Sequence, residues 1–197
     1  MIDTHFHIWQ LARGDYGWLT PAVGSIYRDI TLDDWRRVSR TCGVTGGILV
    51  QAAPTEAETR FLLQQARDAP DVLGVVGWVD MLAHEAAQRI KTLAANAKLK
   101  GLRPMLQDIA DTDWILKDAL SGLWTEAARG TGVSVLEPYM RHIMACFGLR
   151  KILWGSDWPV LELAGTYPSW HAAARELVMP SEQGAVFDAV ARQVYRL

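Results

Sequence analysis

The sequence predicts an α/β domain in which a parallel sheet is covered by outer helices, and two observations support this prediction. Short apolar segments alternate with capped helical segments at the spacing of β-α-β units. The apolar segments at 46–54, 72–80 and 99–106 are hydrophobic throughout, as in strands that are buried on both faces. Sheets of this kind bind ligands at the carboxyl ends of their strands, so functional side chains are expected there.

The chain opens with a predicted strand at 1–9, MIDTHFHIW, followed by a loop at 10–30 that is rich in glycine, proline and aromatic residues. Loops of this length in a compact domain usually carry function or cover a site. A helix is predicted over 31–43 because Thr31 can cap its start, acidic residues fill its first turn and Gly43 ends it.

The alternation continues and then changes. Strands are predicted at 46–54, 72–80 and 99–106, and helices at 55–70 and 84–98. Residues 108–132 contain no credible long strand. Beyond them the sequence predicts a helix at 135–148, a last strand at 150–160 and terminal helices at 169–178 and 182–197.

Composition limits the class of partner. The 197 residues are 50% hydrophobic and 21% charged, which is ordinary for one globular domain. The net charge of −2 argues against nucleic acid or an anionic membrane surface as a partner. No apolar run approaches the roughly 18 residues that span a bilayer, and no basic leader precedes the first strand. Cys42 and Cys146 match no metal or redox spacing, so we expect reduced thiols and a cytoplasmic location.

Two histidines and one aspartate form the candidate site. His5 and His7 alternate along the first strand, so both imidazoles are expected on one side of it. Asp157 follows the last strand, where the carboxyl ends of parallel strands meet. Two imidazoles and one carboxylate could hold a divalent metal, with zinc the first choice, and leave an open position for catalysis. Gln51 and Arg103 also fall at strand ends.

Six segments in order, DTHFHIW, LVQAAPTEAET, GVVGWVD, GLRPMLQ, SGLWTEA and GSDWP, carry a family resemblance. Together they resemble the amidohydrolase-related (amidohydrolase 2) family of TIM-barrel hydrolases, and within it the branch that opens sugar and muconate-type lactones. The resemblance covers nearly the whole chain on both sides of residue 120. It implies a (β/α)8 barrel with the site at the carboxyl ends of the strands.

The resemblance also implies roles for individual residues. His5 and His7 match the first-strand pair, and Asp157 matches the aspartate that takes a proton from the attacking water. Arg103 matches a position that helps to bind an anionic or hydroxylated substrate, and Gln51 and Trp158 are further candidate substrate contacts. Members of this branch differ in whether they need a metal.

The chain departs from the family pattern at one junction. In relatives, the helix after the fourth strand leads to two further strands, one ending in an Asp-His motif, and then to a strand before the SGL segment. Here Leu120 is followed directly by Ser121. We therefore predict one domain over 1–197 with an internal deletion of roughly 60 to 90 residues at the 120/121 junction, judged from the usual barrel size. The expected result is an incomplete barrel of about five to six strands that lacks the third site histidine.

Each candidate also has a purely structural interpretation. His5 and His7 could be polar strand residues that bond to the backbone, and Asp157 could be an ordinary turn acid. The acids of two clusters are expected to be solvated charges: Glu56, Glu58, Asp108, Asp111 and Asp113.

Three functions remain open from the sequence. The first is a hydrolase that opens the lactone of a sugar acid or a related small hydroxy acid with water. The second is a metal-dependent decarboxylase of aromatic acids, which shares the HxH opening and the late aspartate, although QAAPTEAET and GLRPMLQ favour the lactonase branch. The third is a non-catalytic incomplete barrel, stabilised as a homo-oligomer that covers the exposed sheet edges.

Overall fold

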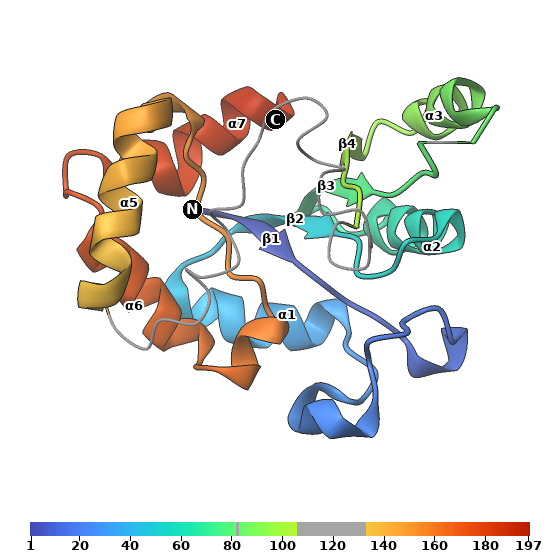
Figure 1. Ribbon diagram of the computed structural model, residues 1–197, viewed down its shortest axis with the longest axis horizontal. Helices are drawn as coiled ribbons and strands as arrows, with labels where there is room; N and C mark the ends of the chain where they lie inside the picture. Colours follow the sequence, from blue (N-terminus) through green and yellow to red (C-terminus); the bar gives the residue numbers. More distant parts are fainter. Residues whose placement is uncertain (82, 106–132) are drawn as a thin grey trace.

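The computed structural model describes residues 1–81, 83–105 and 133–197. Within these ranges a parallel sheet of four strands runs in the order β1-β2-β3-β4, as Figure 1 shows. The strands are β1 (Ile2–Phe6), β2 (Gly46–Val50), β3 (Val72–Gly77) and β4 (Leu99–Leu102). The predicted α/β class with a parallel sheet and outer helices is confirmed, and among the described residues the sheet does not close into a full barrel.

Helices connect the strands and cover the sheet. Three of them separate consecutive strands: α1 (Leu32–Ser39), α2 (Glu56–Arg67) and α3 (Ala86–Ala94). The other three gather near β1, away from α2 and α3 (Figure 1): α5 (Val133–Phe147), α6 (Tyr167–Leu177) and α7 (Val190–Tyr195). None of the helices in the described ranges is long and apolar enough to cross a membrane.

Local sequence signals explain where the first helices begin. The Thr31 hydroxyl accepts a hydrogen bond from the Asp34 amide at 3.2 Å, and the Asp34 carboxylate accepts one from the Thr31 amide at 3.0 Å. This reciprocal capping box satisfies donors that the first turn of α1 would otherwise leave open. At the start of α2 the cap is one-sided: the Thr55 hydroxyl accepts a hydrogen bond from the Glu58 amide at 3.0 Å.

The predicted last strand, 150–160, needs a correction. It lies beside β1 as an extended segment. Backbone hydrogen bonds run from Thr4 to Trp154, from Asp157 to His5 and from His7 to Trp158, but the pairing amounts to an isolated bridge between Phe6 and Trp158 rather than a strand. Short 3-10 turns at Leu149–Lys151 and Val160–Leu163 bound the segment, and Asp157 has a left-handed φ of 56°. Because the left-handed Asp157 interrupts the extended backbone where it meets β1, the segment forms no regular ladder, and the described residues contain four strands rather than five or six. Residues 108–132 and the 120/121 junction lie outside the described residues, and cover of the sheet ends by a second copy stays a prediction.

The hydrophobic core links β1 to the helical layer and to the long loop. Phe6 stacks on Trp35 of α1 with ring centroids 4.0 Å apart. In the loop at 10–30, the backbone of Trp9 exchanges hydrogen bonds with Ile30, and both side chains are buried. The indole of Trp18 donates to the Ala52 carbonyl at 2.8 Å, which fixes this loop to the carboxyl end of β2. The fold therefore holds the loop next to the predicted site.

Candidate metal and catalytic site

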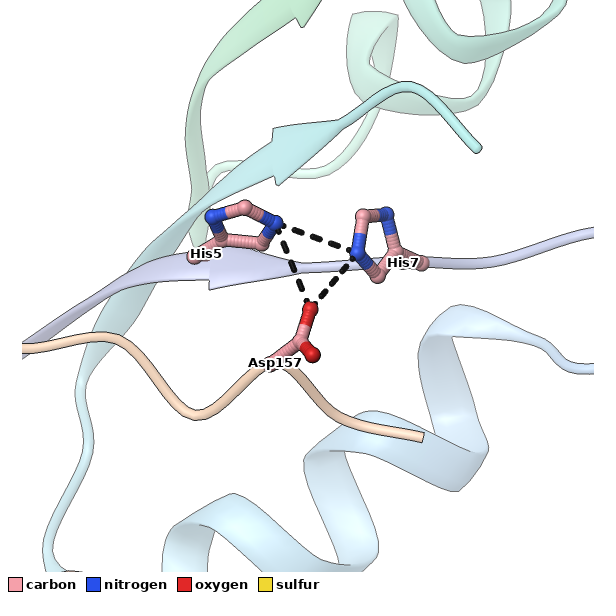
Figure 2. Close-up of side chains that lie close together, drawn as sticks. All are labelled: His5, His7 and Asp157. Atoms are coloured by element: carbon pink, nitrogen blue, oxygen red, sulfur yellow. Dashed lines mark hydrogen bonds and ion pairs between the residues drawn. The ribbon is translucent and has the colours of Figure 1, made fainter. Parts of the chain in front are cut away.

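His5, His7 and Asp157 converge on one point (Figure 2). The Nε2 atoms of the two histidines are 3.1 Å apart. Asp157 Oδ1 lies 3.1 Å from His7 Nε2 and 3.4 Å from His5 Nε2. The histidines come from β1 and the residue just after it, whereas Asp157 comes from the extended segment beside β1. Residues at the two ends of the described chain thus form one cluster.

An irregularity in β1 accompanies this arrangement. Asp3 pairs with Gly47 and Phe6 pairs with Leu49, so β1 has one residue more than β2 between the two pairs. A bulge of this kind changes which side chains share a face. Asp3 and Phe6 both contact Trp35 of the helical layer, whereas the rings of His5 and His7 meet each other with centroids 4.8 Å apart. The two imidazoles therefore lie together, as the sequence predicts.

The orientation of His7 is fixed by the neighbouring strand. Its Nδ1 lies 2.8 Å from the carbonyl oxygen of Val50, at the end of β2. A carbonyl oxygen only accepts, so Nδ1 carries the proton. In a neutral ring Nε2 then presents its lone pair to His5 and Asp157. This is the arrangement of metal-binding histidines, whose second nitrogen is held by a backbone carbonyl.

The charges around the cluster favour neutral His5 and ionised Asp157. Burial, reinforced by the neighbouring His7, lowers the pKa of His5 to about 3. Burial alone would raise the pKa of Asp157. The contact with the His7 ring at 3.1 Å and the electrostatic influence of His7, His5 and Arg103 outweigh that effect, so the Asp157 pKa is lowered. The cluster therefore offers a carboxylate and at least one neutral imidazole as ligands.

The donor set fits a metal cation. With His7 neutral, His7 Nε2 and Asp157 Oδ1 are both acceptors at 3.1 Å, so a proton or a metal ion must lie between them. The three ligand-atom separations, 3.1, 3.1 and 3.4 Å, resemble the edge of roughly 3.3 Å of a tetrahedron with zinc bonds of about 2.0–2.1 Å. Two imidazoles and one carboxylate leave a fourth position open, as catalytic zinc sites do. Among the described residues, these three could hold a divalent metal.

A tight turn presents Asp157. Gly155 lies against β1 so closely that a Cβ there would be 2.6 Å from the His5 Cβ. The next residue, Ser156, is buried and donates from its amide and its hydroxyl to the Asp3 carboxylate. The Asp157 amide then donates to the His5 carbonyl at 2.8 Å. Asp3 and Ser156 are site neighbours that the sequence interpretation missed.

Arg103 and Gln51 lie at the carboxyl ends of β4 and β2. The Arg103 amide donates to the Gly77 carbonyl at 2.8 Å, and the fully buried Gln51 donates from Nε2 to the Arg103 carbonyl at 3.0 Å. Burial lowers the pKa of the Arg103 guanidinium, against the opposing charges of Asp157 and Glu58. Arg103 is therefore within electrostatic reach of Asp157, while Gln51 Oε1 is buried with no hydrogen-bond partner among the described residues.

Trp158 lies inside the wall of the site. Its side chain is 1% exposed, and its indole nitrogen donates to Glu162 at 2.7 Å. A ring this deeply buried serves as packing next to Asp157. Substrate contact by Trp158 stays a prediction.

The expectation that Glu58 is a solvated charge is wrong. Glu58 is fully buried, and its carboxylate accepts hydrogen bonds from the amides of Ala52 and Ala53, just beyond β2. Burial, opposed by these two donors, raises the Glu58 pKa to about 7. The missed signal is its position three residues after the Thr55 cap, where a side chain can reach back to the preceding turn. Asp108, Asp111 and Asp113 lie outside the described residues.

A cavity of about 700 Å³ opens beside the cluster. His5 and Asp157 contribute polar atoms to it, and apolar side chains of α5 and α6, including Ile143 and Trp170, form much of the rest. Thr4, Lys151 and Tyr195 also line it, so a ligand there would meet polar groups at the histidine–aspartate cluster and at these side chains.

The chain is similar to known amidohydrolases and lactonases. The amidohydrolase family profile matches residues 2–135 and 119–197. An L-fucono-1,5-lactonase of Burkholderia ambifaria is 30% identical over 276 residues, covering 100% of this chain and 95% of the relative. An L-fucono-1,5-lactonase of Burkholderia multivorans is 31% identical over 198 residues, covering 89% of this chain and 63% of the relative.

A solved structure agrees with the fold. A Burkholderia multivorans amidohydrolase crystallised with bound zinc superposes with a TM-score of 0.85 at 23% identity, covering 100% of this chain and 99% of that one. Together with the parallel sheet, this likeness shows a TIM-barrel type of fold. The alignment with the Burkholderia ambifaria relative spans 276 residues whereas this chain has 197, so about 79 aligned positions have no counterpart here. Where they are missing stays a prediction, since the 120/121 junction is not described.

Proposed function

The chain belongs to the amidohydrolase family, and from this premise we propose that it hydrolyses the ring ester of a sugar-acid lactone. The observation that carries the proposal is the convergence of His5, His7 and Asp157 within 3.4 Å of one another. The relatives named L-fucono-1,5-lactonase support a 1,5-lactone of a sugar acid as the substrate class.

In this proposal His5, His7 and Asp157 hold a zinc ion. The support is the donor set itself, together with the Val50 carbonyl that directs the His7 lone pair toward the cluster. The solved Burkholderia multivorans amidohydrolase of similar fold holds zinc, which supports this assignment. When bound, zinc supplies Lewis-acid polarisation to the reacting carbonyl and water.

Asp157 serves as the general base. Its Oδ1 faces the imidazoles, whereas its second carboxylate oxygen points away from both rings (Figure 2). That second oxygen takes a proton from water as the water oxygen bonds to the lactone carbonyl carbon. The ring C–O bond then breaks, and the proton passes from Asp157 to the departing ring oxygen. The product is the open-chain hydroxy acid, and Asp157 returns to its ionised form.

Arg103 orients the substrate. Its guanidinium is within electrostatic reach of Asp157 and can donate to a lactone oxygen or hydroxyl. Gln51 helps to hold the backbone of Arg103 in place, because its side-chain amide donates a hydrogen bond to the Arg103 carbonyl at 3.0 Å. The small-molecule substrate therefore lies between Arg103 and the histidine–aspartate cluster in this proposal.

A substrate panel tests the reaction class. The zinc-loaded chain is offered aldono-1,5-lactones, including L-fucono-1,5-lactone, with proton release as the signal, and aromatic acids, with carbon dioxide release as the signal. The proposal expects proton release above the buffer rate with at least one lactone and no decarboxylation. Carbon dioxide release without lactone opening would instead support the decarboxylase alternative.

A further inference from the structure

Asp3 is a buried carboxylate that the proposed reaction does not use. It lies in β1, its side chain is fully buried, and it accepts five hydrogen bonds. The donors are the amides of His5 and Ser156, the Ser156 hydroxyl, the Trp35 indole and the Tyr167 hydroxyl. We infer that Asp3 is a positioning residue, which holds the Gly155–Trp158 turn so that the Asp157 carboxylate meets His5 and His7. The inference deepens the proposed function and rests on it.

The Asp3 carboxylate holds the turn through both of its oxygens. The Ser156 amide donates to Asp3 Oδ1 at 2.9 Å, and the Ser156 hydroxyl donates to Asp3 Oδ2 at 2.7 Å. The same hydroxyl oxygen accepts a hydrogen bond from the Trp158 amide at 3.0 Å. The residues before and after Asp157 are therefore both fixed from Asp3.

The backbone of Asp157 adopts an uncommon conformation that needs support. Its φ of 56° lies in the left-handed region, which residues with a side chain seldom adopt. Such a conformation persists where the surroundings hold it, and residues of this kind gather at functional sites. Two contacts hold this conformation. The Asp157 amide donates a hydrogen bond to the His5 carbonyl at 2.8 Å, and the preceding Ser156 amide donates one to Asp3.

Asp3 is itself held in place by two helices. Trp35 of α1 donates to Oδ2 at 3.1 Å, and Tyr167 of α6 donates to the same oxygen at 2.8 Å. Two helices thus fix the carboxylate, and the carboxylate fixes the turn. Trp35 and Tyr167 hold the same oxygen, so either one still fixes it when the other is lost. The contacts from Ser156 to Asp3 have no such substitute at the turn, and at metal sites the loss of a contact that orients a ligand costs about 10–100-fold in metal affinity or activity.

A matched pair of variants separates positioning from general stabilisation. Removing the Asp3 carboxylate would leave several buried donors without acceptors and destabilise the whole fold. Ser156→Ala and Tyr167→Phe each remove one buried hydroxyl from the same Asp3 oxygen, and both side chains are 1% exposed. Only the serine change also frees the turn.

The first measurement is hydrogen exchange of the Asp157 amide in the metal-free full chain, followed by NMR. We expect exchange about tenfold faster in Ser156→Ala than in Tyr167→Phe, after correction for the global stability of each variant. The second measurement is zinc affinity by competition with a chromophoric chelator. We expect affinity to fall about 10–100-fold in Ser156→Ala and to stay within about twofold of wild type in Tyr167→Phe.

Equal exchange rates in the two variants would overturn the role of Asp3, and so would equal zinc affinities. A wild-type chain that binds no zinc would contradict the proposed function instead. The exchange measurement uses metal-free protein, so it still decides whether Asp3 holds the turn.

Discussion

The Nδ1 atom of His7 lies 2.8 Å from the carbonyl oxygen of Val50, and this contact decides which nitrogen of the ring faces Asp157. Because Nδ1 must donate to the carbonyl, the Nε2 lone pair of the neutral ring points at the carboxylate. The last residue of β2 thereby determines which nitrogen of His7, just after β1, is free to bind a metal.

This contact predicts the behaviour of His7 in NMR spectra. With zinc added, the Nδ1 proton of His7 should remain, while the Nε2 resonance should move as the lone pair binds the metal. The measurement is an ¹⁵N-detected imidazole spectrum recorded with and without zinc, with His7→Gln assigning the signals. A zinc-dependent shift at Nδ1, with Nε2 unchanged, would contradict the assignment of ligand atoms.

Gly155 should tolerate no side chain. Gly155→Ala would place a Cβ 2.6 Å from the His5 Cβ and 3.1 Å from the His5 amide nitrogen. Because the neighbour is the strand itself, we expect a loss of about 1–3 kcal/mol in the free energy of unfolding, together with weaker zinc binding.

Gly184 is the matched control for this change. An added Cβ there meets nothing within 4 Å, and its backbone is already helical, with φ −58°. Gly184→Ala should raise stability by about 0.4–1 kcal/mol and leave zinc binding unchanged. Urea unfolding and chelator competition measure both variants. Equal effects at the two glycines would show that the close approach to His5 has no consequence.

The ion pair between Arg36 and Asp71 should stabilise the domain. Two guanidinium nitrogens donate to the two carboxylate oxygens at 2.7 Å each, joining α1 to the residue before β3. Asp71→Asn should lower the free energy of unfolding by about 1–2 kcal/mol at neutral pH. Asp68→Asn is the control, because Asp68 is 75% exposed and pairs with the exposed Arg67, so its unfolding midpoint should not move.

The same pair predicts a dependence on pH. The hydrogen bonds from Arg36 lower the Asp71 pKa in the folded chain below the ordinary value of 3.8. Stabilisation by Asp71 is therefore fully present above that value and is lost as pH falls through the lower folded pKa. The stability difference between wild type and Asp71→Asn should shrink in acid. A difference that persists below that folded pKa would contradict this explanation.

Glu58 predicts the opposite trend near neutral pH. Burial raises its pKa in the folded chain from 4.5 to about 7, so the folded state binds the proton more tightly than the unfolded state. Its contribution to stability is present below pH 4.5 and is lost as pH rises through about 7. The free energy of unfolding of wild type, minus that of Glu58→Gln, should fall across this window. Parallel pH profiles for the two proteins would contradict a raised pKa.

Much of the fold follows from local patterns that a sequence displays. Apolar runs and helix caps such as Thr31 and Thr55 depend on neighbours within a few residues, and the first four strands appear where those patterns predict them. The segment at 150–160 has an equally apolar pattern. Its irregularity depends on the turn at residues 155–158 and on the contacts of that turn with β1. The residues of β1 are more than 140 positions away in the sequence.

The candidate site likewise combines features that local sequence predicts with features that depend on distant contacts. The spacing of His5 and His7 is a local signal, and the structure brings their rings together. Asp3 and Glu58 are carboxylates, a residue type usually found at the surface, yet both are completely buried. Most donors to Asp3 come from residues far away in sequence, Ser156 and Tyr167 among them, so only the folded chain reveals them. The donors to Glu58 lie in the turn just ahead of it.

The most direct test of the central claim compares the zinc-loaded chain with Asp157→Asn in opening a sugar-acid 1,5-lactone. Asparagine can occupy the same left-handed backbone but cannot take the proton, so the fold should survive while the base is lost. The account predicts a wild-type rate above buffer and a fall of about 10²–10⁴-fold in the variant. A folded variant that opens the lactone as fast as wild type, or a folded zinc-loaded wild type with no rate above buffer, would contradict it.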